Sequence, residues 1–162
     1  MSAFGKGVIG LLRLSLGWIF LWAFIDKLWG LGYATDAAKS WLNGGSPTTG
    51  FLKFGSEGPF ADFFQGLAGS AWVDWLFMLG LLGIGIALVL GAGVRIAGCA
   101  GALLMVLMWL AVLPKENNPF LDDHTIYFFV FLVLPSVHAG RYVGFGKWWE
   151  KTSLVRMFPW LE

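Results

Sequence analysis

The sequence predicts an all-α membrane protein whose apolar helices cross a bilayer four times. Of its 162 residues 57% are hydrophobic and only 13% are charged, and the mean hydropathy is +0.71. Soluble domains of this length do not usually reach such values. Four apolar runs account for the excess, three of about the length that spans a hydrocarbon core and a fourth that is short for a full span. The length suits one domain, so residues 1–162 are expected to form a single membrane domain with the lipid bilayer as its solvent.

The first apolar run predicts a helix over residues 8–29. A cleaved signal peptide would end in a short apolar region and a small-residue site, whereas this run continues through aromatic residues into Asp26 and Lys27. The segment is therefore expected to stay attached.

The next two runs predict a tight helical hairpin, 72–90 and 96–113, because only Gly91-Ala92-Gly93 and the residues up to Arg95 separate them. Small residues recur four apart on both runs, as in Gly83 and Ala87 or Gly98 and Ala102. In lipid such spacing favours close helix contact, so these two helices are expected to pack on each other. A homo-oligomer face is the alternative use of the same small residues.

A fourth helix is expected over 123–137, with Asp122 or Asp123 as its N-cap and Pro135 near its end. Before it, Pro114 stops the third helix and Lys115 to Asp122 form a polar loop. The tail, residues 141–162, mixes aromatic and basic residues and is typical of a segment lying in the membrane interface.

The distribution of basic residues predicts the orientation, because Lys and Arg are retained on the cytoplasmic side of short loops. Seven fall on the side of the termini and four on the side of residues 30–70. The seven are Lys6, Arg13, Arg95, Arg141, Lys147, Lys151 and Arg156, and the four are Lys27, Lys39, Lys53 and Lys115. Both termini are therefore expected in the cytoplasm, in a multi-pass protein of a prokaryotic inner or plasma membrane.

The segment 30–70 is too long for a simple connection and is expected to be partly structured on the extracytoplasmic side. It serves either as a cover for the helix ends or as a lid or docking surface.

The formal net charge of +1 excludes the basic surplus that nucleic acid binding requires. Cys99 is the only cysteine, so an intrachain disulfide is impossible, and no His or Cys spacing predicts a metal site.

Ionisable residues inside membrane spans are costly, so each is a functional candidate. On the cytoplasmic side Arg13 and His138 are the candidates for contact with a bound ligand; snorkelling of Arg13 to the interface and an ordinary surface role for His138 are the alternatives. On the outer side the candidates for substrate binding are Lys27, Asp26, Asp74 and His124. An ion pair of Lys27 with Asp26 or Asp74 that only holds helix ends together is the competing interpretation.

Two stretches carry a resemblance to a known family. Leu12-Arg13-Leu14-Ser15-Leu16-Gly17-Trp18-Ile19-Phe20 and Ala23-Phe24-Ile25-Asp26-Lys27-Leu28 are similar to the opening of the DoxX/DoxD family of small four-helix membrane proteins. Trp41-Leu42-Asn43-Gly44-Gly45-Ser46-Pro47-Thr48 resembles the first loop of the DoxD branch, which includes the membrane subunit of thiosulfate:quinone oxidoreductase. The resemblance covers about residues 8–148.

What the resemblance implies is a subunit that passes electrons from thiosulfate to a membrane quinone as co-substrate, with Arg13 and His138 as the candidates for quinone binding. The sequence shows no haem, flavin or iron–sulfur signature and no thiol pair, so redox chemistry is expected to need a partner protein subunit. A noncatalytic anchor or assembly subunit of a larger, respiratory membrane complex is the second hypothesis. Small-solute transport is disfavoured, because no repeat or paired broken helices are evident.

Overall fold

A computed structural model describes residues 1–114, 118 and 120–162, and within them every regular element is helical. Three helices are long and apolar enough to cross a membrane: α1 (Ala3–Trp29), α4 (Ala71–Leu90) and α5 (Val94–Ala111). A fourth apolar helix, α6 (Asp123–Ser136), has 14 residues and is shorter. The four helices expected from the apolar runs thus form within a few residues of their expected bounds. Lys115, in the expected polar loop, lies outside the described residues.

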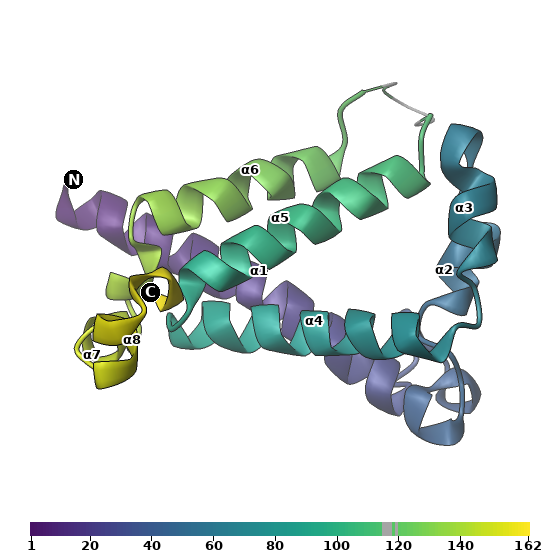
Figure 1. The fold of residues 1–162 in the computed structure, drawn as a ribbon, viewed down its shortest axis with the longest axis horizontal. Coiled ribbons are helices and arrows are strands. Elements are labelled where there is room, and N and C mark those ends of the chain that lie inside the picture. Colours follow the sequence, from purple (N-terminus) through teal and green to yellow (C-terminus); the bar gives the residue numbers. More distant parts are fainter. Residues whose placement is uncertain (115–117, 119) are drawn as a thin grey trace.

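Nine shorter elements complete the described chain. Before α4 they are η1 (Ala37–Lys39), η2 (Trp41–Asn43), α2 (Thr49–Phe54), η3 (Gly58–Phe60) and α3 (Ala61–Gly66); after α6 they are η4 (Ala139–Arg141), α7 (Gly146–Trp149), α8 (Ser153–Met157) and η5 (Pro159–Leu161). The expectation of a partly structured segment 30–70 is therefore confirmed. Its elements gather at one end of the molecule, the loop end, whereas both termini lie at the other, the hairpin end (Figure 1).

Local sequence signals explain where the long helices begin and end. The Ser2 hydroxyl accepts the Gly5 N–H at 3.1 Å and caps α1. Gly30 ends that helix in the left-handed conformation, with φ of 67°. Gly91 and Gly93, with φ of 76° and 71°, form the turn between α4 and α5. Left-handed backbone costs glycine little, so the expected tight hairpin forms.

The long helices pack as two pairs, α1 with α4 and α5 with α6 (Figure 1). Glycines make both contacts close. A Cβ on Gly17 would lie 2.9 Å from the Leu88 Cβ, and one on Gly85 would lie 2.6 Å from the Leu21 Cγ. A Cβ on Gly98 would approach the Phe131 carbonyl oxygen of α6 to 2.8 Å. The pairs are thus held by the close backbone approach usual in lipid.

The small residues do not serve the contact that the sequence suggested. They were expected to bring α4 and α5 together, but Gly98 packs against α6, and Gly83 is exposed with nothing near its Cα hydrogen. Instead α4 and α5 separate with distance from the hairpin, and α2 and α3 cross the open end (Figure 1). A spacing of four residues identifies a face for close packing but does not say which helix occupies it.

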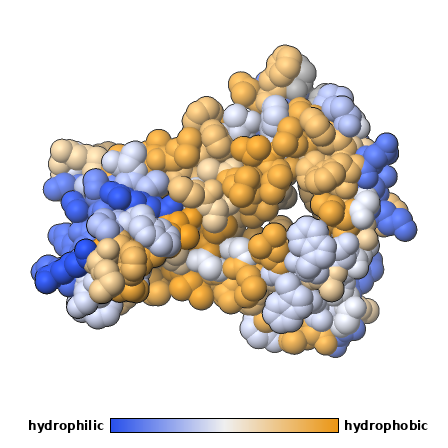
Figure 2. Space-filling model, in the orientation of Figure 1, coloured by the Kyte–Doolittle hydropathy of each residue, from blue (hydrophilic) through white to orange (hydrophobic). Residues whose placement is uncertain are grey.

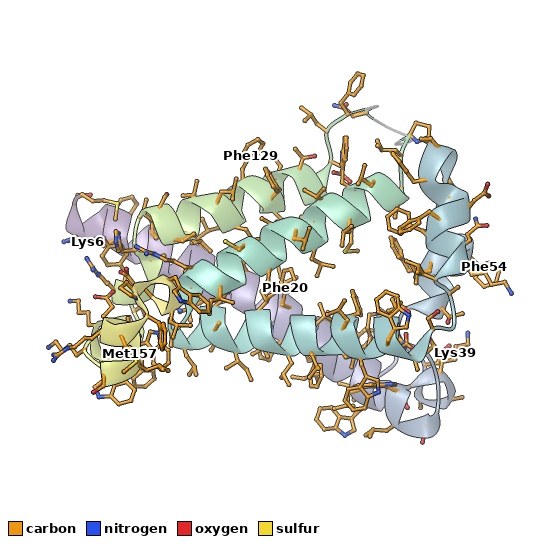
Figure 3. The ribbon with its side chains drawn as sticks, viewed as in Figure 1. Lys6, Phe20, Lys39, Phe54, Phe129 and Met157 are labelled. Atoms are coloured by element: carbon orange, nitrogen blue, oxygen red, sulfur yellow. The ribbon has the colours of Figure 1, made fainter. Side chains whose placement is uncertain are left out.

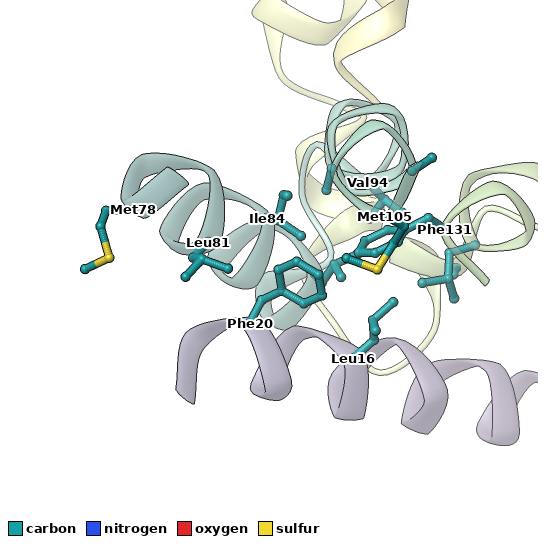
Figure 4. Packing of buried hydrophobic residues seen from close by; sticks show 13 residues of the cluster. Leu16, Phe20, Met78, Leu81, Ile84, Val94, Met105 and Phe131 are labelled. Carbon is teal, nitrogen blue, oxygen red and sulfur yellow. The ribbon is translucent and has the colours of Figure 1, made fainter. Parts of the chain in front are cut away.

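The two pairs meet through a buried hydrophobic cluster in the middle of the molecule (Figure 4). Phe20 of α1 and Phe131 of α6 lie edge to face, with ring centroids 5.3 Å apart, and both are almost fully buried. Such an aromatic pair contributes about 0.5–1.5 kcal/mol beyond its buried area. A second cluster, formed by Leu52, Phe64 and Ala111, fixes α2 and α3 to the end of α5.

The surface has the distribution expected of a protein in a bilayer. Hydrophobic residues cover the middle of the molecule, and hydrophilic residues gather at the hairpin end and at the loop end (Figure 2). Most of the side chains that face outward from the long helices are large and apolar, as Leu76, Leu79 and Leu103 show. Together with the three helices that are long and apolar enough to cross a membrane, this belt indicates a membrane-associated protein.

Candidate functional site

Asp26 is buried beside the end of α1, where it organises the turn that follows. Its carboxylate accepts the backbone N–H of Tyr33 at 3.3 Å and that of Ala34 at 3.0 Å. A buried carboxylate is stable only when hydrogen bonds satisfy its oxygens, and these two bonds do so. Asp26 therefore holds the start of the segment 30–70 against the helix.

Asp74 performs the same task from the first turn of α4. One of its oxygens, Oδ1, accepts the hydroxyls of Ser46 at 2.8 Å and Thr48 at 2.5 Å, and the Thr48 N–H at 3.3 Å. The carboxylate is 7% exposed. In the sequence Ser46 and Thr48 stood out only as part of the stretch that resembles the DoxD loop, and nothing in their spacing pointed to a partner 28 and 26 residues ahead. Trp41 and Trp75, with ring centroids 4.6 Å apart, close the same contact.

Replacement of Asp74 by alanine is expected to release the segment 30–70 from α4. The change removes three hydrogen bonds and leaves the Thr48 N–H buried without its acceptor, at a cost of about 2–4 kcal/mol. Limited proteolysis of the purified protein measures this as faster cleavage between residues 42 and 50. Asp62→Ala, at an exposed aspartate of α3, is the matched control and should leave the cleavage rate unchanged. Equal cleavage of the wild-type protein and the Asp74→Ala variant would show that Asp74 does not hold this segment.

Lys27 is half-buried at the end of α1 and forms no ion pair with any carboxylate that the structure describes. Its neighbour Asp26 is directed to Tyr33 and Ala34, and Asp74 is directed to Ser46 and Thr48. No close salt bridge of the kind expected as the competing interpretation is therefore among the described contacts, although the negative charge of Asp26 still acts on Lys27. The ammonium has no carboxylate in direct contact among the described residues, which leaves room for an anion beside it.

His124 lies apart from these groups. Its Nδ1 is 2.6 Å from Asp122 Oδ2 and 3.5 Å from Asp123 Oδ1, so three consecutive residues form a local cluster at the start of α6. Asp122 also caps the helix by accepting the Thr125 N–H at 3.2 Å. Figure 1 places the start of α6 and the end of α1 on opposite sides of the loop end. The outer candidates thus divide into Lys27, Asp26 and Asp74 on one side and His124 on the other.

Arg13 is fully buried, and its guanidinium joins three segments at the hairpin end. Its Nη1 donates to the carbonyls of Leu88 and Val89 near the end of α4. Its Nη2 donates to the carbonyls of Tyr142 at 3.0 Å and Val143 at 2.7 Å. The side chain therefore turns inward to backbone acceptors instead of snorkelling to water. Its Nε is buried and has no hydrogen-bond partner among the described residues.

The backbone around Arg13 is packed closely enough to require glycine. A Cβ on Gly144 would lie 2.8 Å from the Arg13 Nη2, and one on Gly91 would lie 2.9 Å from the Gly140 carbonyl oxygen. Val143 has a φ of 53°, a conformation unfavourable for a β-branched residue, and its carbonyl is one of the acceptors of Arg13. The guanidinium thus stabilises a strained turn.

His138 lines a small pocket at the hairpin end, together with Trp149 and several charged residues. Its Nε2 is 3.5 Å from Glu162 Oε1, and the side chain is 38% exposed. Arg141 Nε donates to both oxygens of Glu150, at 2.7 and 3.0 Å, and Arg95 Nη2 lies 2.9 Å from Glu162 Oε2. Nothing in the spacing of the residues indicated that these acids would be the partners of Arg95 and Arg141.

Arg141 and Glu150 shift each other's ionisation. The hydrogen bond to Glu150 raises the pKa of Arg141 above its ordinary value. Partial burial acts to raise the pKa of Glu150, but the hydrogen bond and the positive charge of Arg141 outweigh it and leave that pKa below its ordinary value. Both groups are therefore charged at neutral pH.

Neither family models nor curated proteins nor solved structures include a match to this chain. The site is therefore interpreted from its own geometry, with the resemblance as a hypothesis.

Proposed function

We propose that the protein is the membrane subunit of an oxidoreductase complex of the DoxD type, which passes electrons from thiosulfate to a membrane quinone together with a partner subunit. The observation that carries the proposal is Lys27, a half-buried lysine without an ion pair to any described carboxylate, at the end of α1 and within the stretch that resembles the family. Thiosulfate is a small dianion and needs such a positive group. Asp26 and Asp74 shape the site by holding the segment beside it, and His124 lies at the far side of the loop end beside Asp122 and Asp123.

The proposed quinone site lies at the hairpin end, beside the hydrophobic belt from which a lipid-soluble co-substrate would arrive (Figure 2). Arg13 and His138 are the candidates there for contact with a quinone head group. His138 is the accessible one, because it is 38% exposed and lines the small pocket. Arg13 is fully buried with both terminal nitrogens engaged by backbone carbonyls, and only its buried Nε is without a described partner.

The proposal includes a topology of four crossings, with both termini in the cytoplasm and the loop end outside, in a prokaryotic plasma membrane. The common position of the termini at the hairpin end and the excess of basic residues there support it. The short α6 reaches about 21 Å with its 14 residues, less than a hydrocarbon core of about 30 Å, so a fourth crossing requires local thinning of the bilayer or a contribution from the adjoining residues.

Labelling with a membrane-impermeant thiol reagent tests this topology. In a Cys99→Ser background, Asp62→Cys is expected to react in intact cells, because it is exposed at the loop end. Ser153→Cys, exposed in the tail, is expected to react only after the cells are opened. The opposite pattern would reverse the orientation, and labelling of both sites in intact cells would exclude the odd number of crossings, by α4, α5 and α6, that the proposal puts between them.

A noncatalytic anchor or assembly subunit is the second candidate. The observation in its favour is that Arg13, Asp26 and Asp74 all hold backbone or neighbouring loops. The loop end also exposes Tyr33 and Phe54, whose exposed fractions are 75% and 77%. Exposed aromatic residues favour contact with a partner protein.

Isolation of the native complex distinguishes the two functions. The protein is purified from its own membranes in mild detergent, its partners are identified by mass spectrometry, and quinone reduction is measured with and without thiosulfate. We expect a sulfur-handling partner and thiosulfate-dependent reduction. A respiratory or other enzyme complex without that activity would favour the anchor and reject the oxidoreductase.

A further inference from the structure

The C-terminal platform, residues 141–162, is folded and attached to the start of α5. The Arg95 N–H donates to the Glu162 carbonyl at 2.8 Å, and the Trp149 indole donates to the Leu161 carbonyl at 2.8 Å. The Arg141–Glu150 pair links the beginning of the platform to its middle. The platform therefore has a defined position beside the hairpin end (Figures 1 and 3).

The ion pairs of the platform leave it with an excess of positive charge. Its acids, Glu150 and Glu162, are engaged by Arg141 and Arg95. Lys147, Lys151 and Arg156 are exposed, and none of them forms an ion pair with a described residue. The acids closest in sequence to these cations are thus already paired with arginines. The three cations can therefore attract an anion from outside the protein.

The same platform exposes large apolar side chains. Phe145, Trp148, Leu154, Met157, Phe158 and Trp160 are between 44% and 70% exposed. Tryptophan with neighbouring basic residues is typical of the level of the lipid head groups, where the ring meets the acyl boundary and the charge meets phosphate. The platform lies at the edge of the hydrophobic belt, where that boundary falls (Figure 2).

We propose that the C-terminal platform binds the head groups of anionic phospholipids, with Lys147, Lys151 and Arg156 contacting phosphate and the exposed aromatic residues lying among the head groups. The pairing of Glu150 and Glu162 with arginines favours this binding, because unpaired carboxylates on the platform would repel the anionic lipid. This inference depends neither on the proposed redox function nor on the orientation of the chain.

Native mass spectrometry of the purified protein in neutral detergent tests the proposal, with phosphatidylglycerol or phosphatidylcholine added as the probe. The wild-type protein is expected to bind phosphatidylglycerol at least tenfold more tightly. A basic residue near an anionic surface contributes about fivefold in affinity, so Lys147→Gln with Lys151→Gln should weaken phosphatidylglycerol binding about 25-fold. Lys39→Gln with Lys53→Gln, at the loop end, is the matched control and should change nothing.

Two results would overturn the proposal: equal affinity of the wild-type protein for both lipids, or an equal loss in the platform and control variants. Lys147→Arg with Lys151→Arg keeps the charge and should keep the affinity. A loss in that variant too would assign the effect to packing of the platform and would equally reject phosphate binding by charge. Thermal unfolding of each variant establishes that the compared proteins are folded.

Discussion

Replacement of Arg13 by leucine is expected to destabilise the folded protein by about 3–5 kcal/mol, although a leucine inserts into a bilayer more favourably. The guanidinium is fully buried and donates to four backbone carbonyls. Without it these four carbonyls, one in a buried bond and three in partly buried ones, each lose a bond to a charged donor. The turn around Val143 loses its support at the same time.

Unfolding of the purified protein in increasing denaturing detergent measures this effect. Arg13→Lys keeps the charge but offers a single nitrogen, so it should fall between the wild-type protein and the leucine variant. Arg156→Leu removes an exposed arginine and serves as the control, with little expected change. A leucine variant as stable as the wild-type protein would show that the guanidinium bonds do not hold the hairpin end together.

The helices could be predicted because lipid imposes a simple requirement on the sequence. Apolar runs of sufficient length marked α1, α4 and α5, and the glycines between 91 and 93 marked their hairpin. The start of α1 was placed too late, at residue 8 instead of Ala3, because the segment Phe4 to Gly7 carries Lys6 and two glycines and has a weak apolar pattern. Its cap, Ser2, was the signal that marks the true start.

The pairing of the helices and the partners of the buried charges could not be predicted in the same way. Gly98 offers a close-packing face whether α4 or α6 occupies it, and only the three-dimensional arrangement selects α6. Asp74 was recognised as costly to bury, but its acceptance of the Ser46 and Thr48 hydroxyls depends on a loop that turns back over the helix. The partners of Lys27 could not be predicted from the sequence. The neighbouring Asp26 suggested a close ion pair, which the described contacts do not contain.

The proposed function depends most directly on Lys27, and its replacement by glutamine in the purified complex is the decisive measurement. Loss of the contact between an ammonium and a dianion costs about 3 kcal/mol, so thiosulfate-dependent quinone reduction is expected to fall about 100-fold in kcat/KM. Lys27→Arg should recover part of the activity, and Lys39→Gln, at an exposed lysine, should retain all of it. Thermal unfolding and the composition of the complex should be unchanged in each variant. If the glutamine variant loses its fold or its partner while the surviving complex keeps full specific activity, or if it keeps both complex and activity, Lys27 does not bind thiosulfate and the anchor function gains.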